Sequence, residues 1–188
     1  PISANGVSVL SLLIGIAAGW LLMEGSYVSI LQAAGLIVVS YVLDNCDGEV
    51  ARARGQASAF GEALDDFADW IVHAVFFFGL GYGHAEISGE NVWFWLGNIA
   101  AVGATINYFI GQYLTILERR REEQEEDEDE DVQVEDEEKV ILPTTPLLWV
   151  IYFLRELSRA DFCFLVVLLA LPGGLWVLLP AGAIGAQI

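Results

Sequence analysis

The sequence is poor in the residues that usually bind zinc or form disulfide networks. It contains two cysteines and two histidines among 188 residues. Cys46 and Cys163 lie far apart in the chain, and two cysteines do not make a disulfide framework. A zinc site normally draws its ligands from several cysteine and histidine side chains. The sequence therefore gives no sign of a disulfide-rich fold or of a zinc centre.

Basic residues are also scarce. Eight lysines and arginines stand against 26 acidic residues, which gives a net charge of −18 at pH 7. Fourteen of the acidic residues lie between Glu118 and Glu138, so one segment causes most of the imbalance. We expect a solvated, self-repelling loop at about residues 118–142; a regulatory or cation-gathering role is the alternative. Such a charge argues against nucleic acid as a partner and against attraction to anionic lipid.

Apolar residues make up 55% of the chain and gather in blocks. A membrane span needs about 20 apolar residues, and the first two blocks reach this length with their flanks. The last two blocks are short and are separated by Pro172, Gly173 and Gly174. We predict an all-α integral membrane protein with six transmembrane helices in one domain, residues 1–188. The blocks are residues 7–23, 27–43, 67–82, 92–117, 162–171 and 175–188.

The positions of the basic residues indicate the orientation of these helices. With the N-terminus inside, all eight fall in the cytoplasmic connections or at the helix ends beside them, and the opposite connections contain none. The positive-inside rule predicts this asymmetry. The first residues are polar and uncharged, which predicts no signal peptide. The basic residues are Arg52, Arg54, Arg119, Arg120, Arg121, Lys139, Arg155 and Arg159.

Acidic residues also stand where the second helix is expected to end and the third to begin. Asp44 and Asp47 are three residues apart, and Asp65 and Asp69 are four apart, so each pair shares one face of a helix. Ionisable groups in a membrane span are costly and indicate function. Carboxylates brought together need a compensating charge, and oxygen ligands favour hard ions such as Mg²⁺, Mn²⁺ or Ca²⁺. Arg52 could supply one positive charge.

Small residues lie between the acidic pairs and at the middle of the first helix. Gly48, Ala51 and Gly61 leave room for a flat or phosphorylated ligand near the backbone, although small residues also let membrane helices pack closely. The spacing of Gly15 and Gly19 matches a helix-packing pattern. A cation transporter or channel would explain the carboxylates but not the fixed offsets of these small residues and Arg52. We therefore favour a ligand-binding enzyme site, with the transporter as the alternative.

These residues together resemble the motif of the CDP-alcohol phosphotransferase family, D-x-x-D-G-x-x-A-R, eight residues, G-x-x-x-D-x-x-x-D. Every fixed position is matched with the spacing intact, in Asp44-Asn-Cys-Asp47-Gly48-Glu-Val-Ala51-Arg52 and Gly61-Glu-Ala-Leu-Asp65-Asp-Phe-Ala-Asp69. The resemblance implies the CDP-alcohol phosphotransferase fold and a membrane homodimer. It also implies a transferase that moves a phosphoalcohol, such as a phosphatidyl group, from a CDP-alcohol to an acceptor hydroxyl and releases CMP.

The resemblance also implies roles for individual residues. Asp44, Asp47, Asp65 and Asp69 would bind Mg²⁺ or Mn²⁺, as a two-metal site, and Asp69 would also be the general base. The residues expected to bind the CDP group are Gly48, Ala51, Arg52, Gly61, Asn5 and Ser8. Asn5 and Ser8 resemble the family's P-N-x-x-T stretch, but Ala4 replaces its proline. Arg159 and Arg155 are the expected contacts for the acceptor or its phosphate.

The substrate pair stays open at this point. The donor is CDP-diacylglycerol or a soluble CDP-alcohol, and the acceptor is a lipid or a polyol, in phospholipid or phosphodiester biosynthesis. Few basic residues exist to bind a phosphorylated acceptor, which slightly favours an acceptor of low charge. The expected site opens on the cytoplasmic side, where lipid and soluble substrates can both enter.

Deleting residues 122–138 tests the interpretation of the acidic segment. We expect the shortened protein to release CMP at nearly the wild-type rate, because a solvated segment contributes no group to the site. The assay compares both proteins in the same detergent at equal protein concentration. A deletion protein that is folded, as judged by its helical circular dichroism, but inactive would contradict the interpretation.

Overall fold

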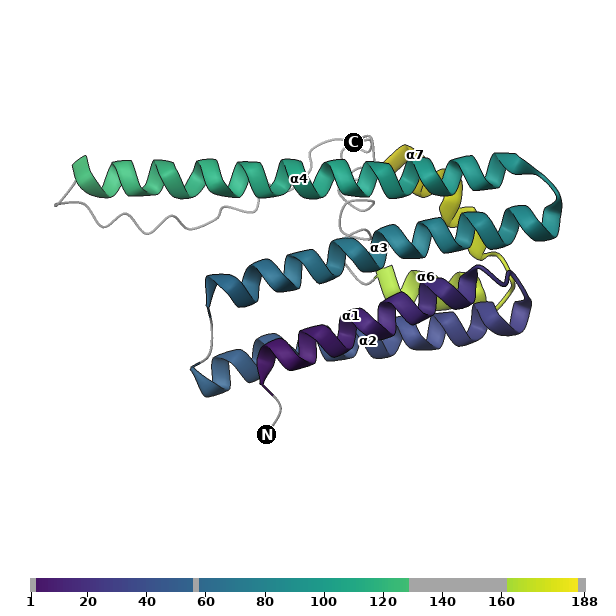
Figure 1. The fold of residues 1–188 in the computed structure, drawn as a ribbon, viewed down its shortest axis with the longest axis horizontal. Helices are drawn as coiled ribbons and strands as arrows, with labels where there is room; N and C mark the ends of the chain where they lie inside the picture. Colours follow the sequence, from purple (N-terminus) through teal and green to yellow (C-terminus); the bar gives the residue numbers. More distant parts are fainter. Residues whose placement is uncertain (1–2, 56–57, 129–161, 186–188) are drawn as a thin grey trace, which may run out of the picture. The chain divides into compact units, whose positions relative to one another are not determined.

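The computed structural model describes residues 3–55, 58–128 and 162–185, and these residues form helices and no strands (Figure 1). The chain divides into two compact units. The first consists of residues 1–108 together with 163–188, and the second consists of residues 109–162. The first unit holds all the described motif residues. The elements are α1 (Ala4–Leu22), α2 (Tyr27–Arg54), α3 (Ala59–Ser88), α4 (Asn91–Glu128), α6 (Phe162–Ala170), the 3-10 helix η1 (Leu175–Val177) and α7 (Leu178–Gly185).

Serine caps fix where the first three helices begin. The side chains of Ser3, Ser26 and Ser58 each accept a hydrogen bond from a backbone N–H of the first turn, which satisfies a donor that the helix leaves free. Gly55 ends α2 in the left-handed conformation, with φ of 62°, a conformation that glycine adopts without steric cost. The end of α2 and the start of α3 are therefore both set by local sequence.

Helix α1 is the centre of the first unit. It packs along its length against both α2 and α3, whereas α2 and α3 make few direct contacts with each other in the described residues. Its buried positions recur every three or four residues, as a helix with one packed stripe requires. Those positions are Ala4, Val7, Ser8, Ser11, Gly15, Ala18, Gly19 and Leu22. Since α2 and α3 both rest on α1, this helix sets the distance between them.

Glycines bring the backbones of α1 and α3 into contact. A Cβ atom added to Gly79 would collide with the carbonyl oxygen of Gly19, and one added to Gly15 would collide with Val72. Close approach of this kind provides the van der Waals contact that holds helices together in lipid. The packing role predicted for Gly15 and Gly19 is confirmed. Gly81 and Gly97 bring α3 and α4 equally close, since a Cβ on Gly81 would lie 2.8 Å from the Gly97 Cα.

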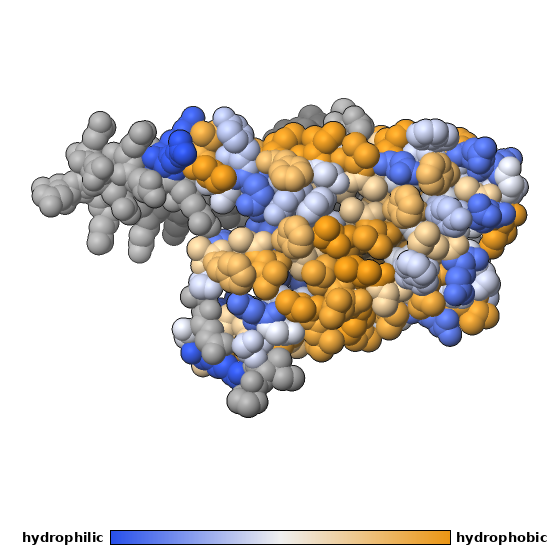
Figure 2. All heavy atoms as spheres, viewed as in Figure 1, coloured by the Kyte–Doolittle hydropathy of each residue, from blue (hydrophilic) through white to orange (hydrophobic). Residues whose placement is uncertain are grey.

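Within the described residues, three helices are long and apolar enough to cross a membrane: α1, α2 and the Asn91–Leu117 part of α4. Their large apolar side chains are extensively exposed, as in Leu13, Trp20 and Val102, and Figure 2 shows apolar residues gathered over the middle of the helices. Outward-facing apolar side chains suit a lipid environment. The predicted number of six spans is not confirmed. Asp69 and His73 interrupt the apolar stretch of α3, and α6 and α7 are short within the described residues.

Two helices extend further than the apolar blocks predict. The second block ends at Leu43, but α2 continues to Arg54, so the first half of the motif is helical. The fourth block ends at Leu117, but α4 continues to Glu128, where we expected a loop. Glutamate and arginine are good helix formers and extend a helix that apolar residues have started. Residues 129–142, the rest of the expected acidic loop, lie outside the described residues.

Replacing Gly79 with alanine tests the glycine contact between α1 and α3. The added methyl group meets the Gly19 backbone, so we expect the unfolding free energy to fall by about 1–3 kcal/mol, the usual cost of overpacking. Gly35→Ala is the matched control, because Gly35 lies in α2 with no atom within 4 Å of an added Cβ. Thermal unfolding in detergent should show a lower melting temperature for Gly79→Ala only. Equal melting temperatures would contradict the close contact.

Candidate functional site

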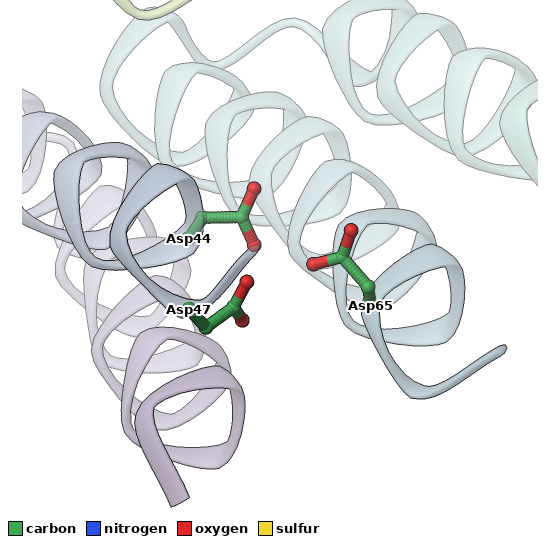
Figure 3. A group of neighbouring side chains, drawn as sticks. All are labelled: Asp44, Asp47 and Asp65. Atoms are coloured by element: carbon green, nitrogen blue, oxygen red, sulfur yellow. The ribbon is translucent and has the colours of Figure 1, made fainter. Parts of the chain in front are cut away.

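The last turns of α2 and the first turns of α3 carry the acidic motif. Asp44 and Asp47 project from one face of α2, and Asp65 projects from α3 (Figure 3). Each of these three residues offers an oxygen that lies within 4.8 Å of the other two. In Figure 3 the two carboxylates of α2 are directed toward that of Asp65. The predicted meeting of the two helices at their acidic ends is therefore present in the structure.

The donor set of this cluster fits a hard divalent cation. Asp47 is buried and Asp44 and Asp65 are half-buried. The Oδ1 atom of Asp65 is buried and has no hydrogen-bond partner among the residues that the structure describes, and buried polar atoms normally have one. Carboxylate oxygens are ligands of Mg²⁺, Mn²⁺ and Ca²⁺. A bound cation would supply both the missing partner of Asp65 and the charge that three neighbouring carboxylates require.

Asp47 is connected to α1 by a hydrogen bond that sequence spacing does not reveal. The Ser8 hydroxyl donates to Asp47 Oδ2, and the two residues are 39 positions apart. Both side chains are buried. Ser8 was predicted to lie near the nucleotide, and its side chain contacts a cluster carboxylate.

Asp69 stands one helical turn after Asp65 but is not part of the group of three. It is exposed, so solvent or a substrate can reach it. The backbone carbonyl of Asp69 lies 2.8 Å from His73 Nδ1, a contact within α3 that occupies the ring nitrogen and not the Asp69 carboxylate. Its position on the same helix as Asp65 matches the sequence prediction, and its role as a base is untested.

Arg52 forms an ion pair with Glu49 on its own helix, although its charge could have compensated the clustered aspartates. Its Nη2 atom lies 2.6 Å from Glu49 Oε1, and both side chains are largely exposed. The guanidinium also covers Gly48, because Arg52 Nη1 is 3.5 Å from the position of a Cβ there. The charge of Arg52 is therefore directed to Glu49 and not to the three clustered aspartates.

Ala51, one turn beyond Asp47, is half-buried.

Gly61 and Asn5 lie together although they come from different helices. A Cβ added to Gly61 would be 3.5 Å from Asn5 Oδ1 and 3.4 Å from Ser58 Oγ. The beginnings of α1 and α3 thus meet at the same end of the first unit as the carboxylates. Of the predicted site residues, Arg155 and Arg159 lie outside the described residues.

Trp70 anchors the acidic end of α3 to α4, which the sequence analysis did not foresee. Its Nε1 donates to Thr105 Oγ1 at 3.0 Å, and its ring stacks on that of Tyr108 with centroids 4.9 Å apart. In the sequence, the only signal for this contact is that a tryptophan directly follows Asp69. The contact holds the turn that carries Asp65 and Asp69.

The model of the CDP-alcohol phosphatidyltransferase family matches residues 2–176. No curated protein matches the chain. The matched range contains the whole acidic cluster, both glycines of the motif and the whole of α1, α2, α3 and α4. Since the match extends over most of the sequence, the chain belongs to the CDP-alcohol phosphatidyltransferase family.

Proposed function

We propose that this protein transfers a phosphoalcohol group from a CDP-alcohol to an acceptor hydroxyl and releases CMP. The family match supports this type of reaction. The single observation that links this reaction to particular residues is that Asp44, Asp47 and Asp65 come together from two helices. The match gives no support to the alternative of a cation transporter or channel.

The cluster is proposed to hold Mg²⁺ or Mn²⁺, in a two-metal site that Asp69 completes. Asp44 and Asp47 would be the ligands from α2, and Asp65 and Asp69 those from α3. The chemistry that such ions supply when bound is neutralisation of the diphosphate and stabilisation of the leaving CMP. The buried, unpartnered Asp65 oxygen supports this assignment, since a coordination bond would satisfy it.

Asp69 is proposed to be the general base. The acceptor hydroxyl attacks one phosphorus of the diphosphate in line with the leaving CMP, and its proton moves to a carboxylate oxygen of Asp69. Direct transfer needs no covalent enzyme intermediate. The exposure of Asp69 supports this role, because the base must reach a hydroxyl on a separate molecule.

The CDP group is proposed to lie over the small residues of the motif. Gly48, Ala51 and Gly61 present little side chain, and the Asn5 amide beside Gly61 offers hydrogen bonds at that surface. Arg52 could leave Glu49 for a phosphate, since the exposed ion pair that holds it stabilises the protein by at most about 1 kcal/mol. Arg155 and Arg159 remain proposed contacts of the acceptor.

The protein is proposed to work at the cytoplasmic surface of a membrane. The family match and three apolar helices support an integral membrane protein. A helix of 28 residues such as α2 is about 42 Å long, which exceeds the roughly 30 Å of the hydrocarbon core. An α2 that starts in one interface therefore places its last turns at the other. The basic residues favour the cytoplasmic side, and a homodimer is the proposed assembly.

The substrate pair can be identified with a CMP-release screen. CDP-diacylglycerol and soluble CDP-alcohols are offered to purified protein with a panel of lipid and polyol acceptors. The scarcity of basic residues favours an acceptor with little charge, in phospholipid or phosphodiester synthesis. Absence of CMP release from every pair, with folded protein and Mg²⁺ or Mn²⁺ present, would contradict the proposed function.

Asp69→Asn tests the base. We expect CMP release to fall by roughly 10²–10⁴-fold, because the amide cannot accept the hydroxyl proton. Asp66→Asn is the control, since it removes a neighbouring carboxylate that lies off the paired face. Wild-type activity in the Asp69 variant would remove Asp69 as the base, whereas equal loss in both variants would point to a general effect of charge on α3.

Removing divalent cations tests the metal site. We expect excess EDTA to abolish CMP release and added Mg²⁺ or Mn²⁺ to restore it. Asp65→Asn should need a higher cation concentration for half-maximal activity, because one ligand charge is lost. The measurement is a titration of activity against free cation for both proteins. Undiminished activity in EDTA after dialysis would exclude metal dependence.

A further inference from the structure

We propose that Ser8 is a positioning residue, which fixes the Asp47 carboxylate in the orientation in which it faces Asp44 and Asp65. The proposal rests on the proposed function, because it concerns the same carboxylate cluster. It gives Ser8 a role in preparing the cation site in place of a direct contact with the nucleotide.

The hydrogen bond from Ser8 to Asp47 is sheltered from water. Ser8 has 4% of its surface exposed and Asp47 has 6%. Its hydroxyl donates to Asp47 Oδ2 and also lies 3.3 Å from the Ala4 carbonyl of its own helix. A hydroxyl has one proton, and an ionised carboxylate accepts more strongly than a neutral carbonyl. The Ser8 proton therefore forms the hydrogen bond to Asp47, and this bond joins α1 to α2.

This bond engages one oxygen of the Asp47 carboxylate, Oδ2. A hydrogen bond to Oδ2 restricts the rotation of the carboxylate. In Figure 3 the Asp47 carboxylate is directed toward the space shared with Asp44 and Asp65. A ligand held in this way loses less rotational freedom when a cation binds, which is how outer hydrogen bonds raise the affinity of metal sites.

Ser11 provides a matched control on the same helix. It lies three residues after Ser8, is 2% exposed and also bonds α1 to α2, because its hydroxyl donates to the Ser40 carbonyl at 2.8 Å. The Ser40 hydroxyl in turn donates to the Ser11 carbonyl at 2.9 Å, so this second link remains when Ser11 loses its hydroxyl. Ser8→Ala and Ser11→Ala thus remove similar buried hydrogen bonds, but only the first reaches the cluster.

The test is a titration of purified full-length protein with Mn²⁺, followed by the electron paramagnetic resonance signal of free Mn²⁺. We expect Ser8→Ala to weaken Mn²⁺ binding by roughly 10- to 100-fold, the range found when hydrogen bonds to metal ligands are lost. Ser11→Ala should bind within about threefold of wild type, a difference too small to reflect such a loss. Ser8→Thr keeps the hydroxyl and should restore most of the affinity. The Michaelis constant for the CDP-alcohol, measured at saturating Mn²⁺, should stay close to wild type in Ser8→Ala.

Each result separates the proposal from its rivals. Unchanged Mn²⁺ affinity in Ser8→Ala would overturn it, and so would a Ser8→Thr protein as weak as Ser8→Ala. Equal weakening in the Ser8 and Ser11 variants would show a general loss of packing, and a raised Michaelis constant with normal Mn²⁺ affinity would show a nucleotide contact. If the wild type binds no Mn²⁺, the metal site of the proposed function fails instead, before any variant is compared.

Discussion

The cluster of aspartates depends on the packing of α1 against both α2 and α3. The two helices that carry the carboxylates make few contacts with each other, and their negative charges favour separation. What keeps them at the required distance is the helix between them, which meets α3 through Gly15 and Gly19 and joins α2 through Ser8 and Ser11. The site is therefore an arrangement of three helices, although its charged groups come from two.

This arrangement explains the mixture of residues in α1. Glycines serve the contact with α3, where the backbones need to approach, and serines serve the contact with α2, where polar groups are buried and need partners. In lipid, apolar side chains gain little by meeting each other, so close fit and hydrogen bonds hold helices together. Leu13 and Trp20 face outward on the same helix, which leaves the inward stripe to small residues.

The sequence predicts the charged residues of the site well, but it does not predict the contacts that hold them in place. Residue spacing along a helix predicted that Asp44, Asp47 and Asp65 lie on helix faces that meet. This prediction was possible because helical geometry relates residues that are only a few positions apart. The partner of Asp47 could not be predicted, since Ser8 is 39 positions away and only packing brings it there. The apolar blocks end at Leu43 and Leu117, but α2 and α4 continue beyond them, because apolar composition ends there and helix propensity does not. Arg52 was considered as one source of positive charge for the aspartates, but it pairs with Glu49 on its own helix.

The unbroken course of α2 links two of the clustered carboxylates to the membrane. Asp44 and Asp47 are carried by the same continuous helix that is apolar enough to cross the bilayer, so they move with any tilt or slide of that helix. Lipids that are too thin or too thick for a span change its tilt. Because Asp65 belongs to a different helix, such a change alters the separation of the three carboxylates. The thickness of the bilayer thereby becomes a variable of the geometry of the proposed site.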